Sequence, residues 1–185
     1  MGGVIKADTR QHAGKHVVKE EWWASHGVST VRMKLDYGDY MADGSNISVD
    51  TKRNIAEVAQ NINGRNHDRF KRECVRARDA GCRLVVLVEN RDGVRDVKGV
   101  VRWVNDHCRA CASRVRRACN PRDASTKCPR HGTMKPIQGP RLSKAMKTME
   151  GRYGVRFEFC APSESARIIC ELLGVEYEQD AESSS

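Results

Sequence analysis

Residues 84–88, Leu-Val-Val-Leu-Val, form the most apolar stretch of the chain and decide its fold class. A short apolar run bounded by polar residues is typical of a central strand that is buried on both faces, with helices on either side. Further apolar-rich or alternating segments predict strands over 4–7, 31–35, 47–51 and 155–159. Helical spacing predicts helices over 15–26, 54–63, 68–80, 142–153 and 163–173, the last capped by Ser163 and ended by Gly174. This order predicts one α/β domain with a central mixed β-sheet flanked by helices.

Asp39, Asp50 and Lys52 form the first candidate site. The segments 31–35 and 47–51 are expected to form a hairpin that brings Asp39 close to Asp50. Side chains two residues apart on a strand share a face, so Asp50 and Lys52 point the same way, beside the carbonyl of Thr51. Two carboxylates and a carbonyl are oxygen ligands suited to Mg²⁺, which can activate a water that Lys52 orients or helps to deprotonate. The alternative is a solvated hairpin face, because so short a pattern also arises by chance.

Charge and hydropathy suggest the partners. The chain has 33 Lys and Arg against 24 Asp and Glu, a formal net charge of +9. This balance favours a polyanion such as DNA, although many basic soluble proteins bind none. No apolar run has the length of a membrane span or the form of a signal peptide, so we expect a cytoplasmic, nucleoid-associated protein with no membrane partner.

Four motifs carry a wider resemblance. They are Asp8-Thr9-Arg10, Gly38-Asp39-Tyr40, Val49-Asp50-Thr51-Lys52 and Leu87-Val88-Glu89. In this order they resemble the nuclease domain of the xeroderma pigmentosum group F (XPF) family, in the PD-(D/E)xK superfamily. The resemblance covers nearly the whole chain, from Ile5 to Leu173, apart from one insert. It implies a restriction-endonuclease-like fold, cleavage of branched or recombination DNA with Mg²⁺ or Mn²⁺, and the family's habit of forming a homodimer.

Site residues carry over by position. Asp8, Asp39 and Asp50 are implied acids of the metal site, and Lys52 is the motif lysine. Arg10 and Glu89 are implied further site residues; for these two and for Asp8, a structural salt bridge is the alternative. Asp50 and Thr51 depart from the family's usual Glu and Arg. Larger members add tandem helix-hairpin-helix units, so this chain resembles the short, nuclease-only members found in bacteria and phages.

A Cys- and Arg-rich insert over 106–137 interrupts the family pattern. Two closely spaced ligand pairs have the spacing of a tetrahedral structural Zn²⁺ site, namely Cys108 with Cys111 and Cys128 with His131. Cys119 is an alternative ligand, and a loop of free thiols is the alternative interpretation. The insert's candidate DNA contacts are Arg109, Arg114, Arg116 and Arg117. The nuclease domain is expected to span 1–176, followed by a polar, disordered tail over 177–185.

Three functions are therefore compared. The first is a metal-dependent DNA endonuclease, which the acids and the lysine favour. The second is a catalytically silent DNA-binding module, which would keep the basic insert and lose the acids. The third is a zinc-organised interaction protein whose contact with DNA is incidental.

Overall fold

The structure is a single mixed sheet between helical layers. The computed structural model describes residues 3–10, 17–64, 66–115, 119–120, 128 and 136–179. The strands are β1 (Val4–Asp8), β2 (Ser29–Met33), β3 (Tyr40–Ala42), β4 (Ile47–Lys52), β5 (Arg83–Glu89) and β6 (Arg156–Cys160). Their order in the sheet is β2-β1-β3-β4-β5-β6, and β3 is antiparallel to both of its neighbours while all other pairs are parallel. The predicted α/β class with a mixed sheet is confirmed.

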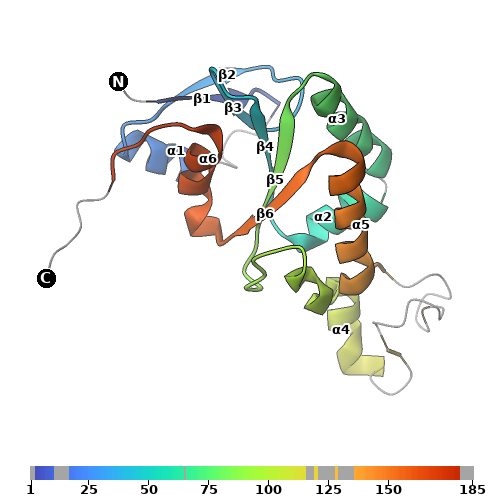
Figure 1. Cartoon of the computed structure of the whole chain (residues 1–185). Coiled ribbons are helices and arrows are strands. Elements are labelled where there is room, and N and C mark those ends of the chain that lie inside the picture. The colour runs from blue at the N-terminus through green and yellow to red at the C-terminus, as the bar shows by residue number, and fades with distance from the viewer. Residues whose placement is uncertain are drawn as a thin grey trace, which may run out of the picture.

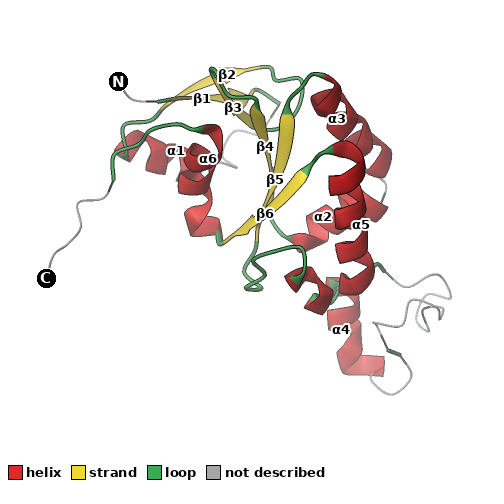
Figure 2. Ribbon diagram, viewed as in Figure 1, coloured by secondary structure: helices red, strands yellow, loops and turns green. Residues whose placement is uncertain are grey.

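Helices cover both faces of this sheet (Figures 1 and 2). One face packs on α1 (Val17–Ser25) and α6 (Ser165–Leu173). The other face packs on α2 (Ile55–Asn63), α3 (His67–Asp79) and α5 (Gly139–Tyr153). In β5, Val86 and Val88 join the core under α2, α3 and α5, whereas Leu87 joins the core under α1 and α6. The apolar run is thus buried on both faces, as its composition predicts.

The predicted hairpin between 31–35 and 47–51 is wrong. Strand β2 pairs in parallel with β1 at the edge of the sheet, and all five of its residues are exposed. The hairpin partner of β4 is β3, a three-residue strand that the sequence analysis missed. Because Tyr40 and Ala42 are buried, pairing β3 with β4 buries more apolar surface than pairing the exposed β2 there would. Asp39 and Asp50 are still neighbours, since the Asp39 N–H donates to the Val49 carbonyl at 2.7 Å.

The last helix begins later than predicted. Ser163 lies in a 3₁₀ turn, Pro162–Glu164, and α6 starts at Ser165. The predicted Ser163 cap is wrong because Ser163 lies inside this turn, and Glu164, which precedes α6, makes no side-chain capping bond to the helix. The Glu164 carboxylate accepts the Ala161 N–H at 2.8 Å, at the start of the turn. Gly174 ends the helix with a φ of 70°, as predicted. Beyond it, the Glu178 N–H donates to the His26 carbonyl at 3.0 Å, and residues 180–185 lie outside the described residues.

The insert starts beyond the end of β5. A loop and a 3₁₀ turn, Gly99–Arg102, lead to α4 (Asp106–Val115), which projects away from the sheet in Figure 1. Arg109 of α4 forms an ion pair of 3.4 Å with Asp92 in the loop after β5. The insert is therefore attached on the side where β5 ends. Within the described part of the chain, no helix is both long and apolar enough to cross a bilayer.

Candidate active site

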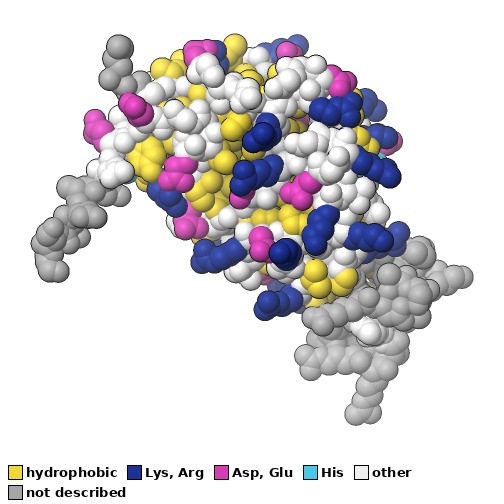
Figure 3. All heavy atoms as spheres, in the orientation of Figure 1, with side chains coloured by type: hydrophobic (Ala, Val, Ile, Leu, Met, Phe, Trp, Pro, Cys, Tyr) yellow, Lys and Arg dark blue, Asp and Glu magenta, His cyan; other side chains and the backbone are white. Residues whose placement is uncertain are grey.

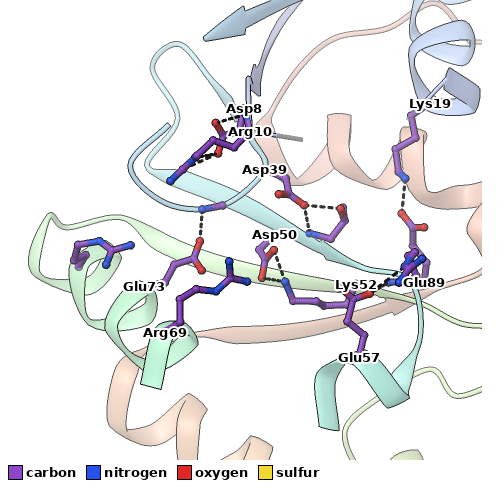
Figure 4. A pocket seen from close by; sticks show the side chains of 14 residues that line it. Asp8, Arg10, Lys19, Asp39, Asp50, Lys52, Glu57, Arg69, Glu73 and Glu89 are labelled. Carbon is purple, nitrogen blue, oxygen red and sulfur yellow. Dashed lines mark hydrogen bonds and ion pairs between the residues drawn. The ribbon is translucent and has the colours of Figure 1, made fainter. Parts of the chain in front are cut away.

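A pocket of about 490 Å³ gathers the predicted site residues at the carboxyl ends of β1, β4 and β5. Its lining consists of Asp8, Arg10, Lys19, Gly38, Asp39, Asp50, Thr51, Lys52, Arg53, Glu57, Arg69, Glu73, Arg76 and Glu89. All six predicted catalytic residues are among them, together with Thr51. Figure 4 shows the other labelled lining residues on helices around these, with Lys19 on α1, Glu57 on α2, and Arg69 and Glu73 on α3. Folding thus brings four separate sequence motifs into one cavity.

Asp50 and Lys52 form a buried ion pair on β4. Their relative exposures are 5% and 8%, and both Asp50 oxygens lie 2.6 Å from the Lys52 Nζ. They share the sheet face of their β5 partners Val86 and Val88, as the two-residue spacing predicts. Asp50 Oδ2 is nevertheless a buried atom without a hydrogen-bond partner. A carboxylate oxygen in that condition is suited to accept a further positive ligand.

Asp39 is held in place by its neighbours in the sheet. Its Oδ2 accepts the Thr51 N–H at 2.9 Å and the Thr51 hydroxyl at 2.6 Å. Gly38, just before it, has a φ of 69°, and a Cβ there would meet the Ser48 hydroxyl at 2.1 Å. The Gly-Asp sequence is therefore required by the turn. Thr51 contributes its N–H and hydroxyl to Asp39, a role the sequence analysis did not foresee.

Two further ion pairs border the pocket. Asp8, at the end of β1, accepts hydrogen bonds from the Arg10 N–H and the Arg10 Nε, at 3.1 and 2.7 Å. Burial opposes ionisation of Asp8, but these bonds outweigh it and lower the pKa of Asp8. Glu89 pairs with Lys19 of α1 at 2.7 Å and accepts the Ser165 hydroxyl at 2.6 Å. Asp8 and Glu89 therefore both form the salt bridges that were the alternative to a catalytic role, and both salt bridges lie in the wall of the pocket.

The protonation of Asp50 and Lys52 follows from their burial. Burial raises the pKa of Asp50 to about 7 against the opposing charge of Lys52, and Asp39 and Glu73 raise it further. The pKa of Lys52 is also raised, because the Asp50 charge and hydrogen bond outweigh a burial that would lower it. The 2.6 Å contact and the raised pKa keep Lys52 an ammonium at neutral pH, so Lys52 is better suited to orient a group than to accept a proton.

Sequence reasoning missed part of the pocket. The missed lining residues are Lys19, Arg53, Glu57, Arg69, Glu73 and Arg76. Three of them, Arg69, Glu73 and Arg76, are spaced four and three residues apart on α3 and so share one helical face. The spacing of these three charged residues is evident from the sequence. The neighbouring residues do not indicate which part of the molecule this face of α3 contacts.

The predicted zinc ligands are only partly described. Cys108 and Cys128 are buried, Cys111 and Cys119 are half-buried, and His131 lies outside the described residues. Arg109 is exposed on α4, while the Arg114 side chain and the whole of Arg116 and Arg117 are not described. The other cysteines, Cys74, Cys82, Cys160 and Cys170, are buried, as expected.

The pocket has a donor set that fits a hard divalent cation. Carboxylate oxygens of Asp39 and Asp50 face one cavity, and Asp50 Oδ2 lacks a hydrogen bond. In the described residues, no three His, Cys, Asp or Glu side chains already lie in an arrangement that could hold a metal ion. Asp50 is instead paired with the Lys52 ammonium, at 2.6 Å. Asp39 and Asp50 are thus the residues that would hold a cation.

The α/β domain with an acid and lysine pocket at its strand ends is consistent with a restriction-endonuclease-like fold. The family model described as "ERCC4 domain" matches residues 7–172, and the chain belongs to this family. The XPF-type resemblance is thereby confirmed, and with it a nuclease that acts on DNA. Nucleases of this family generally depend on divalent metal ions and are generally structure-specific. Comparison with curated proteins gave no match.

Proposed function

We propose that the chain is a Mg²⁺- or Mn²⁺-dependent endonuclease that hydrolyses phosphodiester bonds in branched or recombination DNA. The observation that carries the proposal is the convergence of Asp39, Asp50 and Lys52 in one pocket. A silent DNA-binding module would have no need of a buried, incompletely bonded carboxylate beside a buried ammonium. A pocket built at this cost is typical of catalysis.

The chain's own residues position the reaction. A divalent cation on Asp39 and Asp50 would supply charge neutralisation at the phosphate and a more acidic water. Thr51 fixes the Asp39 carboxylate through two hydrogen bonds, so that its free Oδ1 keeps one orientation. Lys52, protonated and 2.6 Å from Asp50, places a positive charge where the phosphate gains negative charge. The strand supports both groups and limits their movement.

The rim of the pocket is basic. Arg10, Arg53, Arg69 and Arg76 line it and are exposed, so they can contact phosphates on either side of the cut. On the face drawn in Figure 3, Lys and Arg side chains gather over the half that carries α3 and α5. Arg109 adds a further positive charge on α4. Acidic side chains within the pocket can hold the cation, and arginines on the rim can bind the phosphates of a DNA strand that crosses it.

Cleavage assays test this function directly. The purified protein is incubated with labelled flap, fork and four-way junction DNA and with linear duplex, in Mg²⁺, Mn²⁺ or EDTA. We expect cutting of at least one branched substrate in Mg²⁺ or Mn²⁺ and none in EDTA. Tight binding without cutting under every condition would instead support the silent module, and neither binding nor cutting would support the interaction protein.

The pH dependence of cation binding gives an independent prediction. The folded protein raises the pKa of Asp50 from 3.8 to about 7, so protonation of Asp50 stabilises the fold. The stability that Asp50 contributes by binding a proton is fully present below its ordinary pKa of 3.8, and it is lost as the pH rises through about 7. A cation needs the ionised carboxylate, so the increase in Tm on adding Mg²⁺ should be larger at about pH 8 than at about pH 6.

Thermal melts with and without Mg²⁺ measure this effect. The control is Asp50→Asn, in which the increase should be small and independent of pH. A wild-type protein that gains the same Tm from Mg²⁺ at both pH values would contradict the assignment of Asp50.

A structural zinc ion in the insert belongs to the same proposal. Burial raises the pKa of Cys108, and Cys119, Cys128 and Cys111 raise it further, so these thiols lie within electrostatic reach of Cys108. The described cysteines do not already lie in an arrangement that could hold a metal ion. The Gln138 amide also donates to the Cys108 Sγ at 3.1 Å. We expect elemental analysis to find about one zinc per chain, and Cys108→Ser with Cys128→Ser to remove it. If the purified protein contains no zinc and added zinc does not change its Tm, the insert is a loop of free thiols.

Assembly and location complete the proposal. We expect a homodimer, as in the family, and association with the nucleoid through DNA. Sedimentation of the protein alone and with a junction DNA measures the first, because a monomer and a dimer of this chain differ twofold in mass. A monomer in both samples would remove the dimer from the proposal.

A further inference from the structure

Glu73 is the carboxylate that helix α3 contributes to the pocket. It lies near the middle of α3 and is half-buried, and its Oε1 accepts the Gly38 N–H at 2.9 Å. This bond joins α3 to the turn that precedes Asp39, across 35 residues of sequence. Figure 4 shows Glu73 on the α3 side of the cavity, facing the sheet residues Asp39 and Asp50.

Glu73 forms no ion pair with a described residue, although its charge acts on the Arg10 guanidinium. Arg69 and Arg76 lie one turn before and after it and line the same pocket, but no ion pair between described residues includes Glu73. Its Oε2 accepts no hydrogen bond from a described residue. A carboxylate left in this state at a partly buried place is costly unless a cation joins it at some stage of function.

Asp39, Asp50 and Glu73 are three of the carboxylates that line the cavity, and two of them have an oxygen that accepts no hydrogen bond from a described residue. Asp39 uses only Oδ2, for Thr51, and Glu73 uses only Oε1, for Gly38, whereas both Asp50 oxygens lie 2.6 Å from the Lys52 Nζ. The negative charges of Asp39 and Glu73 both act on Asp50, so the three groups are within electrostatic reach of one another. Mg²⁺ and Mn²⁺ prefer such oxygen ligands, and affinity rises with the number of charged ligands.

We propose that Glu73 is a third carboxylate ligand of the divalent cation, supplied by α3 opposite Asp39 and Asp50. The inference rests on the proposed metal-dependent nuclease and adds a ligand from outside the strand motifs. The three carboxylates do not already lie in a metal-holding arrangement, so Glu73 would have to move toward the cation. Its long side chain is held by one hydrogen bond only, which permits that movement.

Substitution of Glu73 by Gln separates the charge from the hydrogen bond. Glu73→Gln keeps an oxygen that can accept the Gly38 N–H, so the turn should stay in place while the negative charge is lost. The matched control is Asp79→Asn, which makes the same charge change on the same helix. Asp79 is exposed, pairs with Arg78 and lies outside the pocket lining.

Binding of Mn²⁺ to the free protein, followed by electron paramagnetic resonance, is the first measurement. We expect Glu73→Gln to weaken Mn²⁺ binding by about tenfold or more, and Asp79→Asn to leave it unchanged. The second measurement is the Mg²⁺ concentration that gives half-maximal cleavage, which should rise by a similar factor. Wild-type Mn²⁺ affinity in Glu73→Gln would overturn the inference and leave Glu73 as a brace for the turn.

Two further outcomes are distinguishable. If Glu73→Gln melts well below Asp79→Asn, Glu73→Asp is tested, which restores the charge on a shorter side chain. Mn²⁺ affinity recovered by Asp relative to Gln supports the ligand role, and equal loss in both overturns it. A wild-type protein that binds no Mn²⁺ and cuts no DNA would overturn the proposed function together with this inference, whereas an active wild type matched by Glu73→Gln would overturn this inference alone.

Discussion

Asp39→Asn is expected to lower the rate of DNA cleavage by about 10³-fold while leaving the fold and the DNA affinity intact. Asn keeps the size of the side chain and an oxygen that can accept the Thr51 N–H, so the turn at Gly38 and its pairing with β4 should survive. What is lost is the negative charge that would help to hold a divalent cation. The rate is measured under single-turnover conditions at saturating Mg²⁺ on the preferred substrate.

The control for Asp39→Asn is Asp43→Asn. Asp43 follows β3 and is exposed, and it pairs with Lys6 outside the pocket lining. Both variants remove one negative charge from the same short stretch of chain, but only the first should lose cleavage. Equal cleavage rates in Asp39→Asn and wild type would take Asp39 out of the mechanism.

Lys52→Ala is expected to abolish cleavage and also to destabilise the protein. Lys52 and Asp50 are both more than nine-tenths buried, and removing one member of a buried pair typically costs about 3–5 kcal/mol. Asp50 can escape part of that cost by taking up a proton, because burial already raises its pKa. The loss of Tm should therefore be smaller at about pH 5 than at about pH 8.

A double variant separates the two effects of Lys52. Asp50→Asn with Lys52→Met removes both charges and fills the same space, so it should recover most of the lost Tm without recovering cleavage. Urea unfolding and the cleavage rate are measured for the single and double variants. A double variant that cuts DNA at the wild-type rate would show that neither charge takes part in the reaction.

The sequence alone determined the fold class and the residues of the strand motifs. Residues 84–88 are apolar without interruption, which is typical of a strand between two helical layers, and β5 lies there. Asp50 and Lys52 share a face because they are two residues apart on one strand, whatever the strand pairs with. Such features depend on neighbours in the chain, so local pattern is enough to find them.

The tertiary structure alone decided which strands pair and what closes the pocket. Strand β3 has three residues, too few for an alternating pattern, and its place between β1 and β4 depends on the apolar surface that pairing buries. Glu73 and Lys19 reach the pocket from helices packed on opposite faces of the sheet, and Lys19 meets Glu89 at the end of β5. Contacts between residues tens of positions apart arise from packing of the whole domain, and no short stretch of sequence records them.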